Sequence, residues 1–395
     1  MISKKAMSIT PSPTLAIDTK FKEMKANGVD VVGFGAGEPD FNTPQHICDA
    51  AIKAIAEGKT RYTPAAGTIA LRQSICNKLK RENGLDYTVQ NIVVSNGAKH
   101  SLANAFLAIC NPGDEVIIPA PFWVSYTEMV KLADGVPVLL PTKEENDFKA
   151  TAAEYENLIT DKTRAIILNS PSNPTGMIYT VEELQAIAEV AVKHNIYVVS
   201  DEIYEHLIYE GKHTSIASFN EKIKDLTIIV NGVSKTYAMT GWRIGYTASN
   251  AAVAKAMSSV QSHAASNPNS IAQEAAIAAL DGGLECVEEM KKSFVERRNY
   301  MVERINTIDG VSCLMPNGAF YIMMNISGIL GKTLYGQKIE TADDFANLFL
   351  DKAKVAVVPG TGFAAPEYVR WSYATSMDNC REGLDRLEKF LKEEA

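Results

Sequence analysis

Five short runs of β-branched and apolar residues alternate with longer stretches of helical periodicity through the middle of this 395-residue chain. The runs are NIVVS at 91–95, EVIIP at 115–119, RAIILNS at 164–170, NIYVVS at 195–200 and LTIIV at 226–230. Strands that helices cover on both faces read as continuous apolar runs, and parallel strands need long crossover connections. The alternation therefore predicts an α/β fold with a mainly parallel sheet covered by helices.

The connection between the third and fourth runs carries a helix signal. Thr180 and Glu183 have the spacing of a capping box, and Leu184, Ile187 and Ala188 follow on one helical face. We expect a helix here that covers one face of the sheet.

The pattern changes from about residue 286. A long charged helical segment, CVEEMKKSFVERRNYMVERINTI, precedes the strand-like runs GAFYIMMNI, KVAVVPG and YVRWSYATS and a final amphipathic helix. We expect a second, smaller α/β domain in this part of the chain.

Charge and residue spacing exclude several classes of partner. The 39 basic and 47 acidic side chains give a net charge of -8, which opposes binding to nucleic acid or to anionic membrane surfaces. The six cysteines lack CxxC spacing and the six histidines lack HxxxH spacing, so we expect no disulfide framework and no metal site. No signal peptide or membrane-spanning segment is visible, and we expect a cytoplasmic protein.

Polar residues follow the predicted strands at the ends where an open parallel sheet binds its ligands. Asn96 and Gly97 end the first strand and begin a helix, whose free amides and dipole favour an anion. The loop PSNPTG presents Asn173, and Asp201 and Tyr204 follow the fourth strand. Taken singly, a helix cap is the favoured explanation of Asp201, and a core aromatic with its hydroxyl at the surface is the favoured explanation of Tyr204.

The fifth strand is followed by NGVSKTYAMTGWRIGY, which places Lys235 and Arg243 among apolar residues. Partial burial lowers the pKa of a lysine and makes it an imine-forming nucleophile. Four consecutive strand ends thus offer an anion-binding helix start, an amide, a carboxylate with a phenol, and a lysine with an arginine. Pyridoxal phosphate is a ligand that uses all of these groups.

At this point the sequence resembles the fold-type-I, class I/II aminotransferases, and most closely their bacterial aspartate aminotransferase subgroup. The resemblance runs over nearly the whole chain, through GAGEPDF, RYTPAAG, NGAKHSL, PAPFWVSY, NSPSNPTG, SDEIYE, SKTYAMTGWRIGY, NGAFY, VAVVPG and VRWSYATS. It implies an N-terminal arm and part of the small domain at 1–47, a large cofactor-binding domain at 48–285 and a C-terminal small domain at 286–395. It also implies a homodimer whose active sites are shared between subunits.

The activity implied by this resemblance is a ping-pong transfer of an amino group between an L-amino acid and a 2-oxo acid. The expected substrates are aspartate or glutamate with 2-oxoglutarate or oxaloacetate, and pyridoxal 5'-phosphate carries the amino group as its pyridoxamine form. Lys235 resembles the lysine that binds the cofactor aldehyde and moves the substrate proton. Asp201 resembles the carboxylate beside the pyridine nitrogen, and Tyr204 the phenol that, with Asn173, hydrogen-bonds the ring oxygen.

The resemblance assigns further residues to binding. The phosphate would be held by Ser234, Arg243, the amides of Gly97, Ala98 and Lys99, and Tyr62 of the neighbouring subunit, and Trp123 would stack on the ring. Arg370 matches the arginine that grips the substrate α-carboxylate, assisted by Asn173 and the backbone of Gly37, with Lys99 and Trp123 also lining the substrate site. The fork of an arginine can make two parallel hydrogen bonds to a carboxylate, which a lysine cannot.

Two departures from the family pattern affect these expectations. The region QSHAASNPNSIAQ lacks the arginine that binds a side-chain carboxylate in other branches, so dicarboxylate preference depends on Lys99. Some relatives also accept prephenate, and Thr14 lies in the segment that would line the distal pocket. Gly232 stands where many relatives carry a phosphate-binding serine.

Two alternatives remain at this stage, and a third is set aside. The enzyme could be an aromatic or prephenate aminotransferase of the same subgroup, or a pyridoxal-phosphate lyase, since lyases share most of these residues. A transcription regulator with an aminotransferase-like sensor domain is a different class, but the family match begins too near residue 1 for a preceding DNA-binding module.

Overall fold

A seven-stranded sheet in the order β2-β8-β7-β6-β5-β3-β4 forms the centre of the larger part of the molecule. This computed structural model describes residues 2–11 and 13–392. The strands from β7 to β4 in this order pair in parallel, whereas β8 is antiparallel to both of its neighbours. The bounds are β2 (Ile92–Ser95), β3 (Glu115–Ala120), β4 (Val136–Pro141), β5 (Thr163–Asn169), β6 (Tyr197–Asp201), β7 (Thr227–Gly232) and β8 (Gly245–Ala248).

All five predicted strands are present in this sheet, and the prediction of a mainly parallel α/β fold is confirmed. The prediction missed β4 and β8. The first of these lies at the sheet edge and contains two prolines, which an edge strand tolerates, and most of its residues are partly exposed. The second has only four residues, too few to show a period.

Apolar side chains cover both faces of the sheet because the strands alternate with a period of two. Val116 and Ile118 of β3 belong to the core on one face, beneath α5 and α6, whereas Ile117 between them belongs to the core on the other face, beneath α7 and α8. This two-sided burial explains why the strands read as unbroken apolar runs.

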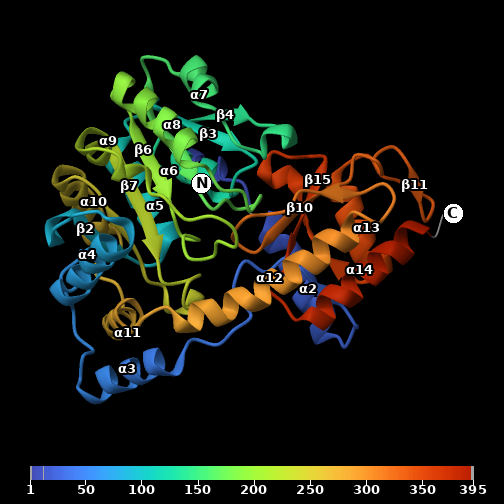
Figure 1. Cartoon of the computed structure of the whole chain (residues 1–395), viewed down its shortest axis with the longest axis horizontal. Helices are drawn as coiled ribbons and strands as arrows, with labels where there is room; N and C mark the ends of the chain where they lie inside the picture. The colour runs from blue at the N-terminus through green and yellow to red at the C-terminus, as the bar shows by residue number, and fades with distance from the viewer. Residues whose placement is uncertain (1, 12, 393–395) are drawn as a thin grey trace.

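The helices lie on both faces of this sheet and around the smaller part (Figure 1). Thr180 caps α8 in the predicted capping box with Glu183. The α-helices are α1 (Lys4–Met7), α2 (Pro13–Ala26), α3 (Gln45–Ala56), α4 (Ile69–Asn83), α5 (Ala98–Ile109), α6 (Ser125–Leu132), α7 (Ala152–Leu158), α8 (Val181–His194), α9 (Glu221–Leu226), α10 (Ala251–Ala264), α11 (Ser270–Asp281), α12 (Glu285–Ile305), α13 (Ala342–Ala353) and α14 (Met377–Lys392). Short 3-10 helices are η1 (Val89–Asn91), η2 (Glu144–Asn146), η3 (Ile216–Ser218), η4 (Thr240–Trp242) and η5 (Gly360–Phe363).

The smaller part contains an antiparallel sheet in the order β14-β15-β10-β9, and α12 runs to it from the larger part (Figure 1). The prediction of one strand in KVAVVPG is wrong, because this segment forms two short strands in different sheets. One of them pairs in parallel with β1 near the N-terminus, while the other joins β15. The bounds are β1 (Val32–Gly33), β9 (Ser312–Cys313), β10 (Tyr321–Asn325), β11 (Thr333–Leu334), β12 (Gln337–Lys338), β13 (Val355–Ala356), β14 (Val358–Pro359) and β15 (Tyr368–Ser372).

Pairing of β1 with β13 brings the N-terminal segment against the C-terminal part of the chain. The domain boundaries at residues 47/48 and 285/286 stay a prediction.

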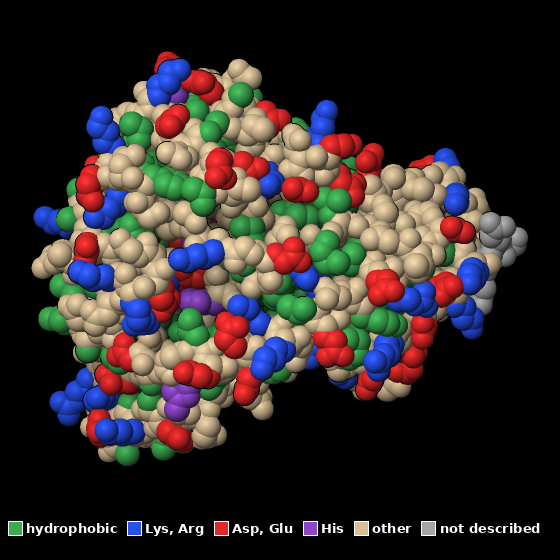
Figure 2. Space-filling view, viewed as in Figure 1, with side chains coloured by type: hydrophobic (Ala, Val, Ile, Leu, Met, Phe, Trp, Pro, Cys, Tyr) green, Lys and Arg blue, Asp and Glu red, His purple; other side chains and the backbone are tan. Residues whose placement is uncertain are grey.

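On the face drawn in Figure 2, acidic and basic side chains are interspersed rather than segregated. Within residues 2–11 and 13–392, no helix combines the length and apolarity needed to cross a membrane.

Candidate active site

A cavity of about 380 Å³ lies beyond the carboxyl ends of β5, β6 and β7 and is also lined from β10 and β15 of the smaller sheet. This volume lies in the range typical of small-molecule sites. The predicted site residues that line it are Gly37, Ala98, Lys99, Trp123, Asn173, Asp201, Tyr204, Ser234, Lys235, Arg243 and Arg370. Segments that are far apart in the sequence therefore meet around one space.

Lys235 follows β7 and donates a hydrogen bond from its Nζ to the carbonyl of Gly37. Its Nζ also lies 5.9 Å from the ring centroid of Tyr204. The pKa of Lys235 is lowered to about 8, mainly by burial; the carboxylate of Glu38 opposes this shift, whereas the charge of Arg243 adds to it. The sequence predicted this direction of shift, and it makes the amine available as a nucleophile and base near neutral pH.

Asp201 is the last residue of β6, and its carboxylate is buried. Its pKa is raised to about 6, because the effect of burial exceeds the opposite effect of two hydrogen bonds. The carboxylate accepts these bonds from the Tyr126 hydroxyl at 2.7 Å and from the Ile203 amide at 3.3 Å. A cationic group beside this carboxylate would be stabilised, because the buried anion has no ion-pair partner among the described residues. Tyr126 was not predicted as a site residue, although it stands in the motif PAPFWVSY.

The beginning of α5 and Arg243 form one corner of the site. Gly97 has a φ of +84°, and no side chain caps the first amides of α5. A Cβ atom at this glycine would lie 2.4 Å from Nη2 of Arg243, so only glycine allows the guanidinium to approach the helix start. Free amides and a guanidinium at one point form an arrangement that suits a phosphate.

Close packing explains the glycine at position 232. Gly232 lies opposite Gly245 in the pairing of β7 with β8. A Cβ atom at Gly232 would lie 2.8 Å from the carbonyl oxygen of Ile244 and 2.9 Å from the Cα of Gly245. The backbone at this position leaves no space for the serine that many relatives were expected to carry.

Arg370 projects from β15 and is 2 % exposed. Its Nη1 donates a hydrogen bond of 3.0 Å to Oδ1 of Asn173, and its Nη2 donates one of 3.0 Å to the carbonyl of Gly35. Its Nε is buried without a hydrogen-bond partner, and no carboxylate of the described residues pairs with the guanidinium. Burial lowers the pKa of Arg370, but an arginine keeps its charge, so this cation lacks an anion that a substrate carboxylate can supply.

Lys99 and Trp123 lie together at another wall of the cavity. The Nζ of Lys99 is 4.9 Å from the ring centroid of Trp123, and burial followed by the charge of Arg243 lowers the pKa of Lys99. Trp123 in turn packs edge-on against Tyr126. These contacts place a cation and an aromatic face on the same side of the site.

Several lining residues were not predicted. Tyr321 on β10 forms a hydrogen bond of 2.9 Å with the hydroxyl of Tyr204. Glu38 accepts a hydrogen bond of 2.7 Å from Thr240, which ties the loop at Gly37 to the segment after Lys235. Glu38 stands in the motif GAGEPDF and Tyr321 in the motif NGAFY, but the spacing of these residues gives no sign that they face a cavity.

Gly97 and Tyr62 are expected residues that do not line the cavity, although Gly97 borders it at the beginning of α5. Tyr62 is 92 % exposed and does not line the cavity of its own chain. The side chain of Thr14 lies outside the described residues, so its expected place in a distal pocket stays a prediction.

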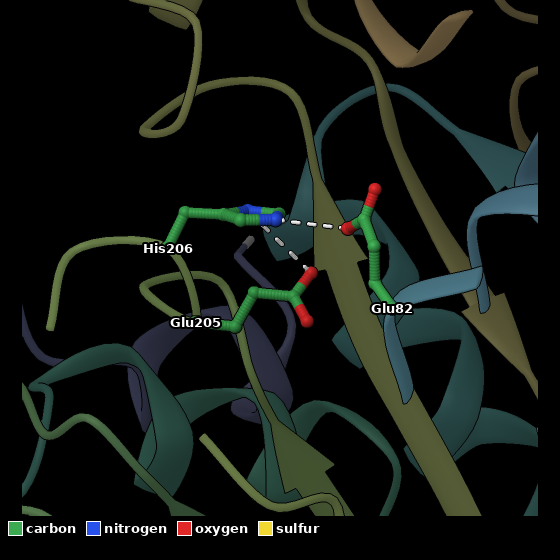
Figure 3. A group of neighbouring side chains, drawn as sticks. All are labelled: Glu82, Glu205 and His206. Atoms are coloured by element: carbon green, nitrogen blue, oxygen red, sulfur yellow. Dashed lines mark hydrogen bonds and ion pairs between the residues drawn. The ribbon is translucent and has the colours of Figure 1, made fainter. Parts of the chain in front are cut away.

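A buried charged cluster lies close to the catalytic segments, where Glu82 and Glu205 flank the ring of His206 (Figure 3). The ring nitrogens of His206 lie 2.9 Å from Glu82 Oε2 and 3.1 Å from the hydroxyl of Thr236, the neighbour of Lys235. The spacing of the histidines in the sequence gave no sign of this cluster. Lys78 contacts both carboxylates and already supplies a positive charge, which opposes the binding of a metal cation there.

Comparison with known proteins places this geometry in a family. Residues 29–387 match the family described as aminotransferase class I and II. The chain is 51 % identical over 395 residues to an aspartate aminotransferase of Geobacillus stearothermophilus, covering 100 % of both chains. It is 46 % identical over 394 residues to an aspartate/prephenate aminotransferase of Nitrosomonas europaea, covering 99 % of each. The structure of the Thermus thermophilus aspartate aminotransferase with maleate superimposes with a TM-score of 0.94 at 43 % identity, covering 99 % of both chains. The chain belongs to the class I and II aminotransferases, enzymes that use pyridoxal 5'-phosphate.

Proposed function

We propose that this aminotransferase moves an amino group between aspartate or glutamate and the 2-oxo acids 2-oxoglutarate or oxaloacetate. The observation that carries the proposal is a single cavity that holds Lys235 with a pKa of about 8, the buried carboxylate of Asp201 and the unpaired guanidinium of Arg370. The names of the relatives support aspartate as a substrate.

The residues present fit the cofactor of the class. The glycine cradle at Gly97 and the guanidinium of Arg243, with Ser234, suit its phosphate. Asp201 suits the protonated pyridine nitrogen, because an adjacent buried anion raises the pKa of such a nitrogen. The amine of Lys235 can bind the cofactor aldehyde. When bound, the cofactor withdraws electrons from the substrate α-carbon and carries the amino group.

The remaining binding groups of the proposal surround the ring. Tyr204 and Asn173 would hydrogen-bond the ring oxygen of the cofactor, and Trp123 would cover one ring face. All three side chains line the cavity, which supports these roles.

In this reaction the chain itself binds the substrate and moves its proton. Arg370 holds the α-carboxylate by its planar fork, and its bond to Asn173 fixes the direction of that fork. The Nζ of Lys235 would take the proton from the substrate α-carbon and hold it for transfer within the site, for which a pKa near the working pH is suited.

Reduction with borohydride tests the covalent role of Lys235. Treatment of the coloured enzyme followed by peptide mapping should label Lys235, while the Lys235→Arg variant should stay unlabelled. If the label lies on another lysine, or on none, the assignment is wrong.

Product analysis tests the reaction class. Incubation with aspartate and 2-oxoglutarate should form oxaloacetate and glutamate in equal amounts. Release of ammonia instead would favour a lyase. The chain is 51 % identical to a relative named aspartate aminotransferase and 46 % identical to one named aspartate/prephenate aminotransferase. The prephenate alternative is therefore not better supported than aspartate.

We further propose that two copies associate and that Tyr62 completes the phosphate site of the partner. Tyr62 is 92 % exposed, and α3 exposes Ile52 and Ile55 at 61 % and 57 %. Exposed apolar side chains of this kind are typical of an association surface. Light scattering should give twice the mass of 43.0 kDa, and Tyr62→Phe should weaken cofactor binding without lowering that mass. A cytoplasmic location stays a prediction.

A further inference from the structure

Two phenols from the two sheets meet in the cavity. The hydroxyl oxygens of Tyr204, after β6, and Tyr321, on β10, lie 2.9 Å apart, and both side chains are buried. Their rings pack edge-on with centroids 5.9 Å apart. Among the described residues, Tyr321 is the only hydrogen-bond partner of the Tyr204 hydroxyl.

Only one of the two phenols can donate this hydrogen bond. If Tyr204 donates to Tyr321, its single hydrogen is not free for any other oxygen. If Tyr321 donates, Tyr204 accepts and keeps its hydrogen for a group inside the cavity. The direction of this bond therefore decides whether Tyr204 can act on the cofactor ring oxygen.

Arg370 favours donation by Tyr321. Its guanidinium lies 4.4 Å from the ring centroid of Tyr321, and a cation beside a phenol makes its hydrogen more acidic. Burial raises the pKa of Tyr321, but Arg370 and Tyr204 lower it. For Tyr204, burial and Tyr321 raise the pKa well above its usual value, although Arg370 lowers it in part. The more acidic phenol is the stronger donor, and that phenol is Tyr321.

Few charged groups surround this pair. Asp201 ends β6, Lys235 follows β7 with its Nζ 5.9 Å from the Tyr204 ring, and Arg370 comes from β15. Glu38, Lys99 and Arg243 line the same cavity at other walls. Of the cations among these groups, Arg370 is the one that lies over the Tyr321 ring, and the α-carboxylate of a substrate neutralises its charge.

We propose that Tyr321 donates its hydrogen to Tyr204 and thereby couples the charge of Arg370 to the hydrogen bond that Tyr204 makes with the cofactor ring oxygen. The inference rests on the proposed function. A substrate carboxylate on Arg370 weakens Tyr321 as a donor, and the bond from Tyr204 weakens with it, because adjacent hydrogen bonds polarise one another. Substrate binding at Arg370 then changes the strength of the hydrogen bond from Tyr204 to the cofactor ring oxygen.

The test is a pH titration of the visible absorbance of the holoenzyme, for the natural protein and Tyr321→Phe, with and without maleate. Maleate is a dicarboxylate without an amino group, so it binds without reacting. Tyr373→Phe is the matched control, because Tyr373 is a buried phenol of the same region whose hydroxyl donates to the Ala319 carbonyl instead.

Tyr321→Phe should raise the titration midpoint by about 0.3 to 0.6 pH unit, because a neighbouring hydrogen bond changes by roughly 10–30 % when its partner is lost. The additional shift caused by maleate should be smaller than in the natural enzyme. Tyr373→Phe should leave both values unchanged. On a Tyr204→Phe background, Tyr321→Phe should add nothing, since the phenol it acts through is gone.

An unchanged midpoint in Tyr321→Phe, or an equal shift on the Tyr204→Phe background, would overturn the coupling. Should the Phe variant fail to fold, Tyr321→Leu gives a second reading: the midpoint should rise at least as much and maleate should bind several-fold more weakly, since the ring under Arg370 is also lost. An unchanged midpoint in this variant overturns the proposal as well. Failure of the natural enzyme to bind cofactor or transaminate would instead contradict the proposed function.

Discussion

The hydroxyl of Tyr126 donates a hydrogen bond of 2.7 Å to the buried carboxylate of Asp201. The two residues come from α6 and the end of β6, which the folded sheet brings together. This bond opposes the effect of burial on the pKa of Asp201, which stands at about 6. The phenol therefore helps to keep the carboxylate ionised at neutral pH.

Replacement of Tyr126 tests this role. In Tyr126→Phe the acid limb of the pH profile of kcat/KM should move up by about one unit, because a hydrogen bond to a charged group contributes about 1.5 kcal/mol. Activity near pH 7 should fall several-fold and recover in part at higher pH. Tyr155→Phe is the control, since the buried hydroxyl of Tyr155 donates to the Ile167 carbonyl away from the site. A Tyr126→Phe profile parallel to that of the natural enzyme would contradict the role.

Lys99 is the predicted selector for a side-chain carboxylate. Lys99→Ala should lower kcat/KM for aspartate by about 10- to 100-fold, which corresponds to the loss of a charged hydrogen bond, and should change the value for phenylalanine little. Lys99→Arg keeps the charge and should retain much of the preference. An unchanged ratio between the two substrates in Lys99→Ala would dismiss this residue as the selector.

The lowered pKa of Lys235 predicts how cofactor uptake depends on pH. The group titrates at about 8 in the folded protein rather than at 10.5, so its neutral amine becomes populated as the pH rises through 8. Covalent uptake of pyridoxal phosphate by the cofactor-free protein should therefore accelerate across pH 7–9 and then level off. Absorbance after rapid mixing measures the rate, and Lys235→Arg is the blank. Acceleration that continues to pH 10 would show an ordinary lysine.

The same shift affects the cofactor-free fold. Between pH 8 and 10.5 the unfolded chain binds a proton at Lys235 that the folded chain does not, so this group adds stability as the pH rises through that window.

The buried cluster behind the site predicts a large stability effect. Lys78 is 1 % exposed, contacts Glu205 and lies 3.4 Å from Glu82. Lys78→Met leaves these carboxylates without their buried counter-ion and should lower the free energy of unfolding by about 3–5 kcal/mol. The matched control is Lys59→Met, whose solvent-screened pair with Glu274 should contribute little to the free energy of unfolding.

Urea unfolding at neutral pH measures both variants, and similar midpoints for the two would contradict the role of Lys78. The sign of its pH dependence follows from Glu205. Burial alone would raise the pKa of Glu205, but Lys78, His206 and His213 lower it strongly. Its contribution is therefore complete above about pH 4.5 and is lost as the pH falls below that value.

Much of the sheet could be predicted because its strands are covered on both faces. Burial on both sides demands unbroken apolar runs such as IVVS in β2 and TRAIILN in β5, and these are visible in any sequence. The strands β4 and β8 were missed because an edge position and a length of four residues remove that signal. The split of KVAVVPG between two sheets depends on β1 and β15, which come from distant parts of the chain.

The site residues also fall into those that the sequence could predict and those that it could not. Residues at the ends of predicted parallel strands, such as Asp201 and Lys235, could be assigned from sequence, because the topology of the sheet brings these ends to one edge. The direction of a side chain on another element is set by packing across layers. Tyr126 and Tyr321 therefore acquired their partners only through the meeting of α6 with β6 and of the two sheets. The sequence determined the chemistry available at the strand ends, and the tertiary structure decided which groups share hydrogen bonds, because those bonds join residues 75 and 117 positions apart.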